Sequence, residues 1–237
     1  MPEDPLRPHE LLAVYYPSHE ARPAFVRALF NRTAGEYDRI NRLFSLGSGG
    51  WYRRRALRRA GVGHGASVLD VATGTGLVAR EAVRLVGDTH RVIGLDLSEK
   101  MLARARTALG IAVIQGHAEA LPIADRSLDF VTMGYALRHM CNLRAAFAEF
   151  RRVLHPGGSV VILEIGRPSE PCAAALARLY LGRIVPALCR TLIPRSAAGT
   201  LMRYHWDTIE ACVPPPIILG GLADAGLEAP ACRIDLG

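Results

Sequence analysis

Long apolar runs are missing from this 237-residue chain, although half of its residues are apolar. A membrane-spanning helix needs about eighteen such residues in succession, so the sequence predicts no transmembrane helix. The N-terminus also lacks the basic start and apolar core of a secretory signal. Both absences favour a cytoplasmic protein.

Paired cysteines are missing as well. The five cysteines are scattered along the chain, and none forms a Cys-x-x-Cys pair. An odd number without close pairs fits neither a disulfide framework nor a zinc site. We therefore expect reduced thiols and no metal.

Lysine is nearly absent: Lys100 is the only lysine among 29 basic residues, and the net charge is +7. Arginines cluster at 53–55 and 58–59, a pattern that can bind nucleic acid or an anionic membrane surface. Aromatic residues that would stack on bases are not interleaved with them, so nucleic acid is not an expected partner. We interpret the cluster as the solvated face of a helix. Its apolar side would carry Trp51, Ala56, Leu57 and Ala60.

Strand and helix signals alternate from residue 67 onward. Strands are expected at 67–71, 91–96, 111–115, 128–134 and 158–164, and helices at 76–86, 98–109 and 142–154. This alternation predicts an α/β fold with a doubly wound, mostly parallel sheet and helices on both faces. Ligands of such folds bind outside the carboxyl ends of the strands.

We expect a single domain over residues 1–237, built from four parts. These are an N-terminal helical cover at 1–60, a cofactor-binding core at 61–166, a substrate-side helical cover at 167–215, and a helix (217–225) with a final strand (232–235) within 216–237. The helical insertion before that strand carries an apolar stripe, which Pro186 would bend or split. The stripe would shape a lipophilic pocket.

Two of the apolar runs end in a carboxylate. The first ends at Asp70 and turns through Gly74 and Gly76, and the second ends at Asp96. Glycines let the backbone approach a ligand, and an acidic residue at the second strand end accepts ribose hydroxyls. Asp70 would repel a pyrophosphate but suits the ammonium and sulfonium of S-adenosylmethionine (SAM), unless it only caps the turn. We therefore predict a SAM site and not a dinucleotide site.

Several further segments match one family pattern. They are Phe30-Asn31-Arg32-Thr33-Ala34-x-x-Tyr37-Asp38, Asp70-x-Ala72-x-Gly74-x-Gly76, Ala118-Glu119-Ala120-Leu121-Pro122, Gly134-Tyr135-Ala136-Leu137-Arg138 and Arg203-Tyr204. Over residues 28–235 the chain resembles class I SAM-dependent methyltransferases and, within them, the ubiquinone/menaquinone C-methyltransferase (UbiE-type) family. The resemblance implies that the segment around Tyr37 folds over SAM. The cofactor-binding residues that we expect are Tyr37, Asp70, Ala72, Gly74, Gly76, Asp96, Leu97, His117, Ala118 and Glu119.

Four positions depart from the family pattern, and the first is Asn31, where the family more often has Asp. His117 stands where the family has Asp or Asn, His139 replaces Asn, and Met202 replaces the first Tyr of a Tyr-Arg-Tyr element. A phenol or its neighbouring ring carbon must lose a proton during methylation, which needs a base or a cation. The catalytic candidates are Tyr135, Arg138, His139 and Tyr204, with His205 nearby. His139 is our hypothesis for the base, whereas Arg138 could instead pair with Glu164.

The predicted function is SAM-dependent methyl transfer to a small lipophilic phenolic or quinol-like acceptor, at carbon or oxygen. The departures leave a second reading open, a tailoring enzyme of secondary metabolism that uses SAM for methylation or ring formation. A nucleic-acid methyltransferase ranks below both, because residues 134–137 read Gly-Tyr-Ala-Leu where such enzymes carry an Asn/Asp-Pro-Pro-Tyr-like run. Peripheral membrane contact and a homodimer stay open.

Overall fold

The computed structural model describes residues 5–45, 47–168, 170–192 and 197–234. Its strands form an all-parallel sheet in the order β3-β2-β1-β4-β5. The strands are β1 (Val68–Val71), β2 (Val92–Asp96), β3 (Ala112–Gln115), β4 (Leu128–Gly134) and β5 (Leu154–Leu163). The chain reverses its direction across the sheet between β1 and β4, the point at which doubly wound folds bind ligands. The predicted α/β architecture is confirmed.

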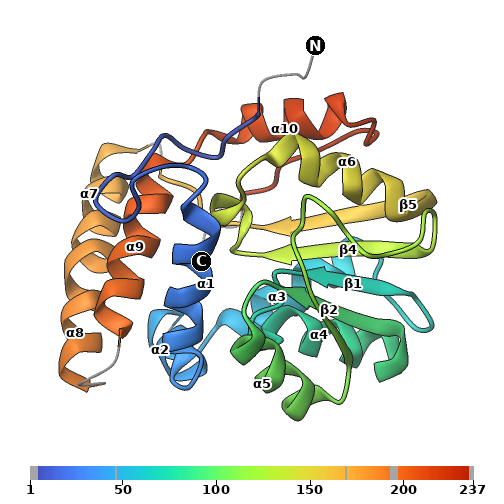
Figure 1. The fold of residues 1–237 in the computed structure, drawn as a ribbon, viewed down its shortest axis with the longest axis horizontal. Coiled ribbons are helices and arrows are strands. Elements are labelled where there is room, and N and C mark those ends of the chain that lie inside the picture. The colour runs from blue at the N-terminus through green and yellow to red at the C-terminus, as the bar shows by residue number, and fades with distance from the viewer. Residues whose placement is uncertain (1–4, 46, 169, 193–196, 235–237) are drawn as a thin grey trace.

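Helices cover both faces of the sheet (Figure 1). On one face, α3 (Gly49–Arg59), α4 (Leu77–Val86) and α5 (Glu99–Leu109) bury Leu57, Val78 and Val86 with Val68 of β1. On the other face, α6 (Leu143–Val153) and α10 (Pro215–Asp224) pack against Leu69 and Val131. The central strand β1 is buried along its whole length, which explains its continuous apolar run.

A third group of helices lies beside the ends of the strands (Figure 1). It contains α1 (Arg22–Thr33), α2 (Tyr37–Phe44), α7 (Pro171–Leu179), the π-helical turn η3 (Tyr180–Ile184), α8 (Val185–Leu192) and α9 (Ala198–Ala211). Val26, Leu29, Val185 and Tyr204 are buried in their shared core. Short 3₁₀ helices, η1 (Thr89–Arg91) and η2 (Leu137–His139), complete the described elements.

Four sequence-based expectations need correction. Residues 9–20 are irregular, although the N-terminal cover was expected to be helical from its start. On α3, Arg53 is buried at 5% exposure and Trp51 is 56% exposed, which reverses their expected faces. Of the two alternatives for Pro186, splitting of the helical stripe is wrong, because α7, η3 and α8 follow one another without a break. Residues 232–234 have no regular secondary structure, and Asp235 of that expected strand lies outside the described residues.

Among the described residues, one helix could cross a membrane by length and composition. It runs over Pro171–Thr191 and contains an 18-residue window of mean hydropathy 1.4. The sequence-based expectation of no such helix rested on uninterrupted apolar runs. Three arginines interrupt this one, so that criterion missed it.

Candidate active site

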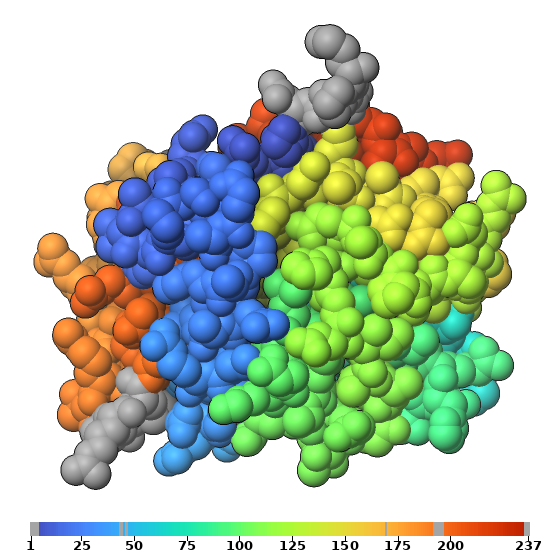
Figure 2. Space-filling model, viewed as in Figure 1, coloured from blue at the N-terminus to red at the C-terminus, as the bar shows by residue number. Residues whose placement is uncertain are grey.

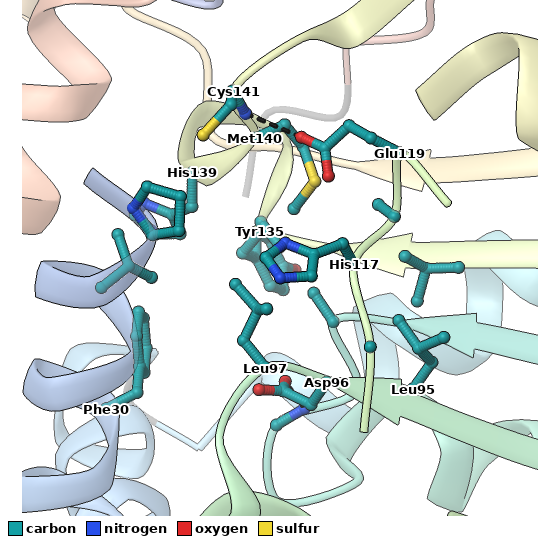
Figure 3. Close-up of a pocket in the computed structure, with 18 of the residues that line it drawn as sticks. Phe30, Leu95, Asp96, Leu97, His117, Glu119, Tyr135, His139, Met140 and Cys141 are labelled. Carbon is teal, nitrogen blue, oxygen red and sulfur yellow. Dashed lines mark hydrogen bonds between the residues drawn. The ribbon is translucent and has the colours of Figure 1, made fainter. Parts of the chain in front are cut away.

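A pocket of about 740 Å³, including its open mouth, lies between α1 and the carboxyl ends of β1, β2 and β4. Figure 3 shows Phe30 and His139 on one side of it, facing His117 and Leu97 on the other. Of the predicted cofactor-binding residues, the structure places Tyr37, Ala72, Gly74, Asp96, Leu97, His117, Ala118 and Glu119 in its lining. The strand ends thus bring together residues that are up to 82 positions apart in the sequence (Tyr37 and Glu119).

Asp96 ends β2 at the floor of the pocket. One carboxylate oxygen accepts a hydrogen bond from the backbone N–H of Gly74 (2.8 Å), and the other accepts one from the N–H of Ser98 (2.8 Å). Burial raises the pKa of Asp96 to about 6, against the effect of these bonds. Gly74 has φ of 58°, a backbone conformation that glycine adopts without strain. The carboxylate therefore fixes the glycine loop and remains at the pocket wall.

Asp70 lies deeper and is 1% exposed. Its carboxylate accepts bonds from the hydroxyls of Thr73 and Thr132 (both 2.7 Å) and from the N–H of Ala79 (3.1 Å). Burial raises its pKa to about 6 as well. The sequence left open whether Asp70 faces the ligand or only caps the turn. The structure shows the second role, because Asp70 accepts hydrogen bonds from Thr73 and Ala79 of the glycine turn and the helix after it. Asp70 also lines a second cavity of about 330 Å³, so a ligand there would lie against it.

Gly76 is the predicted cofactor residue that the structure leaves out of both linings among the described residues. It caps α4 with φ of 85°. A Cβ at this position would lie 2.6 Å from the Cδ1 atom of Leu109. Its lack of a side chain therefore lets the start of α4 approach Leu109 and Ala105 of α5 closely, and its contact with a cofactor stays a prediction.

Helices α1 and α2 close the pocket from the N-terminal side. Phe30 and Tyr37 line it with ring centroids 6.0 Å apart, and burial raises the pKa of Tyr37. Asn31 ties α1 to the start of α5, because its side-chain oxygen accepts from the Ser98 hydroxyl (2.5 Å) and its nitrogen donates to Glu99 (2.8 Å). Phe30 belongs to the motif of the N-terminal segment, but the sequence did not show that its ring forms part of the pocket wall.

Glu119 connects two loops at the far side of the pocket. Its carboxylate accepts hydrogen bonds from the N–H groups of Cys141 (2.9 Å) and Asn142 (3.4 Å), the first of which Figure 3 marks. These bonds hold the loop after β3 against the segment after β4. Met140 and Cys141 of that segment also line the pocket, and no local pattern in the sequence singled them out.

His139 is the candidate base that the structure places in the lining. It is 7% exposed and stacks on Tyr204 with ring centroids 5.3 Å apart and planes 19° apart, while Phe30 meets it edge-on at 5.5 Å. Within the described part of the chain, neither ring nitrogen of His139 has a hydrogen-bond partner. Burial, followed by the charge of Arg138, lowers its pKa well below the ordinary value. The imidazole is therefore neutral at physiological pH, with a free lone pair.

Arg138 has a different environment from that of its neighbour His139. It is fully buried, pairs with Glu164, and donates to the hydroxyl of Thr208 (3.1 Å), with a nitrogen 3.3 Å from Nδ1 of His205. Neither Arg138 nor Tyr204 lines the two cavities in the described structure. Of the two roles left open for Arg138, the structure shows the pairing with Glu164; its role toward a substrate stays a prediction.

Tyr135 follows β4 and lines both cavities. Its φ of 61° is unusual for a residue with a side chain. The Arg53 guanidinium lies 5.3 Å from the centre of its ring and donates to the side-chain oxygen of Asn41 (3.0 Å). Burial raises the pKa of Tyr135. Arg53 itself lines the second cavity, a role that the surrounding run of arginines hid in the sequence.

The apolar stripe of 171–203 does not shape either cavity. None of its described residues is in their linings, and its inner side packs with α1 and α9 instead. The expected lipophilic wall comes from Pro23, Val26 and Phe30 of α1. The prediction that this stripe forms the pocket was therefore wrong.

Comparisons with known proteins agree with the arrangement of the strands and loops. The chain is 33% identical, over 90% of its length and 88% of the relative, to the ubiquinone/menaquinone biosynthesis C-methyltransferase UbiE of Syntrophotalea carbinolica. It is 36% identical to the 2-phytyl-1,4-naphtoquinone methyltransferase of Synechocystis, over 70% of this chain and 72% of that one. A SAM-dependent methyltransferase structure from Thermotoga maritima shares the fold (TM-score 0.59, 20% identity, 84% and 80% coverage). The profile of the ubiE/COQ5 methyltransferase family matches residues 17–227, and the chain belongs to that family.

Proposed function

We propose that the two cavities form one bent SAM site. They share Tyr37, Ala72, Gly74, Gly134 and Tyr135, so a ligand can continue from one into the other. The larger cavity, with Asp96 at its floor, suits the adenosine part, since a half-buried carboxylate accepts two hydroxyl bonds well. The smaller cavity suits the amino-acid part. There, Arg53 would hold the carboxylate and Asp70 would face the ammonium group.

The acceptor that we propose is a lipophilic quinol. Several relatives are named as methyltransferases of quinone biosynthesis, and the larger cavity offers the side chains that such a ring needs. Val26, Phe30 and Met140 line it, and they present carbon and sulfur to the pocket. A ligand wall of this kind binds flat apolar rings and excludes water.

SAM, when bound, supplies an electrophilic methyl group on a positively charged sulfur. The chain must hold the acceptor so that one of its ring carbons lies close to this methyl group. That carbon becomes nucleophilic when the hydroxyl of the quinol is deprotonated, and it loses its own proton once it carries the methyl group. His139 carries the observation that supports this proposal: it lines the pocket, and its ring nitrogens have no hydrogen-bond partner in the described chain. It would accept the hydroxyl proton. Arg138 holds the segment that carries it through the pair with Glu164.

The test is methyl transfer by the purified chain with SAM and a panel of reduced quinones and simple phenols. We expect S-adenosylhomocysteine to form with demethylated quinols, and the product to carry the new methyl group on a ring carbon. Methylation at oxygen, or a cyclised product without a methyl group, would place the chain with the tailoring enzymes. Release of no S-adenosylhomocysteine with any acceptor would contradict the proposed acceptor class.

Arg53→Gln tests the proposed orientation of SAM. We expect the dissociation constant of SAM to rise about tenfold, the cost of one charge-assisted bond. Arg55, which lies over the ring of Trp51 on the exposed side of the same helix, offers the matched control, and Arg55→Gln should change nothing. Equal affinities of the two variants would contradict a role for Arg53 in binding SAM.

A further inference from the structure

The outer side of α7, η3 and α8 is an exposed apolar surface. Leu176 is 67% exposed, Leu179 48%, Ile184 41% and Leu188 39%. Only 17% of the most apolar window of this helix is buried inside the fold. The helix forms the left edge of the molecule in Figures 1 and 2. Contiguous exposed apolar surface of this kind marks an interaction site.

The charges on this helix are all of one sign. Arg178, Arg183 and Arg190 are exposed, and Pro171–Thr191 contains no acidic residue. Glu210 of α9 pairs with Arg178, which leaves Arg183 and Arg190 as further positive charges beside the leucines. Apolar side chains together with arginines are the composition of helices that lie in the interface of an anionic bilayer.

The inner side of the helix is firmly packed on the rest of the fold. Val185 and Cys189 are fully buried, and a Cβ on Gly182 would lie 3.1 Å from the indole of Trp206 on α9. A membrane-spanning arrangement would have to break this packing. The helix can instead rest on a membrane with its outer side while its inner side stays attached to α9.

We infer that the outer side of α7–η3–α8 binds the surface of an anionic lipid bilayer. A second copy of the chain fits the same surface less well, because a two-fold contact would bring the arginines of both copies together. The inference rests in part on the proposed function, since a lipophilic quinol resides in the bilayer and an enzyme that methylates it must reach that phase.

The experiment is co-sedimentation of the full chain with vesicles of phosphatidylcholine alone or mixed with phosphatidylglycerol. We expect binding to the mixed vesicles, at least about tenfold weaker binding to neutral ones, and release by high salt. Leu176→Ser with Leu179→Ser should weaken binding at least about tenfold. Arg183→Gln with Arg190→Gln should weaken binding to anionic vesicles by about tenfold or more and leave binding to neutral ones unchanged.

Ile217→Ser is the matched control, because Ile217 is 45% exposed on α10, away from this surface. All these variants change exposed side chains, so their melting temperatures should equal that of the wild type. The leucine variant should also keep its turnover of a short-chain quinol in solution while it loses turnover of a quinol embedded in vesicles.

The inference is overturned if the wild type binds no vesicles, or if the leucine variant binds as tightly as Ile217→Ser. It is overturned too if the variants only convert a dimer to a monomer in sedimentation, or if alkaline carbonate fails to release the bound chain, which would indicate a spanning helix. Vesicle binding needs no turnover. The result therefore decides this inference even if no quinol is methylated.

Discussion

The two sides of the pocket differ in how far the chain satisfies its own polar groups. On the strand side, the carboxylates of Asp70 and Asp96 accept bonds from nearby hydroxyls and backbone N–H groups. On the helix side, both ring nitrogens of His139 lack partners in the described structure. A fully bonded side is ordered before a ligand arrives, whereas an unbonded buried nitrogen is costly unless a ligand uses it. This difference is the basis for our proposal that the first side binds SAM and that the second side transfers the proton.

Asp96→Ala should give the largest effect on the binding side. Two hydroxyl bonds to a half-buried carboxylate would be lost, each worth about 1.5–3 kcal/mol, so we expect the dissociation constant of SAM to rise at least about 100-fold in calorimetry. Asp96→Asn keeps an acceptor for the N–H of Gly74 but lacks the charge. Its dissociation constant for SAM should therefore lie between those of the wild type and Asp96→Ala. An unchanged dissociation constant in Asp96→Ala would contradict the ribose role.

Arg138→Met tests the support behind the unbonded side. The substitution leaves Glu164 without its buried partner and removes the bond to Thr208. We expect the free energy of unfolding to fall by about 3–5 kcal/mol in urea titration. Arg178→Met removes an exposed ion pair instead and should cost under about 1 kcal/mol. If both variants lost a similar free energy of unfolding, burial would not make the Arg138–Glu164 pair more stabilising than an exposed pair.

His139→Ala should lower kcat about 100-fold, the lower range for loss of a general base, while the dissociation constant of SAM stays unchanged. Because the pKa of His139 is lowered well below its ordinary value, the wild-type rate should be level near neutral pH and fall only in the acidic range. The variant should lack this acidic limb. A wild-type limb centred near pH 7 would show that another group titrates.

Asp70→Asn should have the smallest effect, visible in the pH dependence of stability. The folded-state pKa of about 6 lies above the ordinary value of 3.8, so the folded chain holds this proton more tightly than the unfolded chain does. Its contribution to the free energy of unfolding therefore falls as pH rises from about 4 to 6, by about 1–3 kcal/mol. Asp70→Asn should remove the part of this slope that Asp70 contributes and leave the part of the same sign that comes from Asp96, whose pKa burial also raises to about 6.

Asp129→Asn is the control of opposite sign. Hydrogen bonds from the N–H and hydroxyl of Ser67 lower the pKa of Asp129, so its contribution is present above the unfolded pKa and lost as pH falls through the folded value. A slope of the same sign from both aspartates would contradict the assigned burial of Asp70.

The strand side of the pocket was predictable from sequence because its chemistry is local. Asp96 ends an apolar run, and a parallel sheet places such ends together. The helix side was not predictable in this way. His139 and Tyr204 are 65 positions apart in sequence, and no periodicity shows that their rings stack. The stripe of 171–192 is apolar on more than one side, so its pattern did not show which side packs inward.

Arg53 illustrates the same limit. Five arginines lie within seven positions, and this pattern predicts one charged surface. In the folded chain, however, Arg53 is buried, which depends on how α3 packs on the rest of the fold. Arginine is usually solvated, so the sequence predicts Arg53 in solvent, although Arg53 is buried and lines the second cavity together with Asp70 and Tyr135.

Ala72 and Tyr135 end neighbouring strands in left-handed backbone, with φ of 55° and 61°. Such a conformation disfavours branched side chains far more than small ones. If every amino acid were tried at position 72 and the library selected for folding alone, glycine, asparagine and alanine should survive, and valine and isoleucine should vanish. The backbone conformation at this one position thus limits the amino acids that members of the family can carry there while they keep the pocket lining intact.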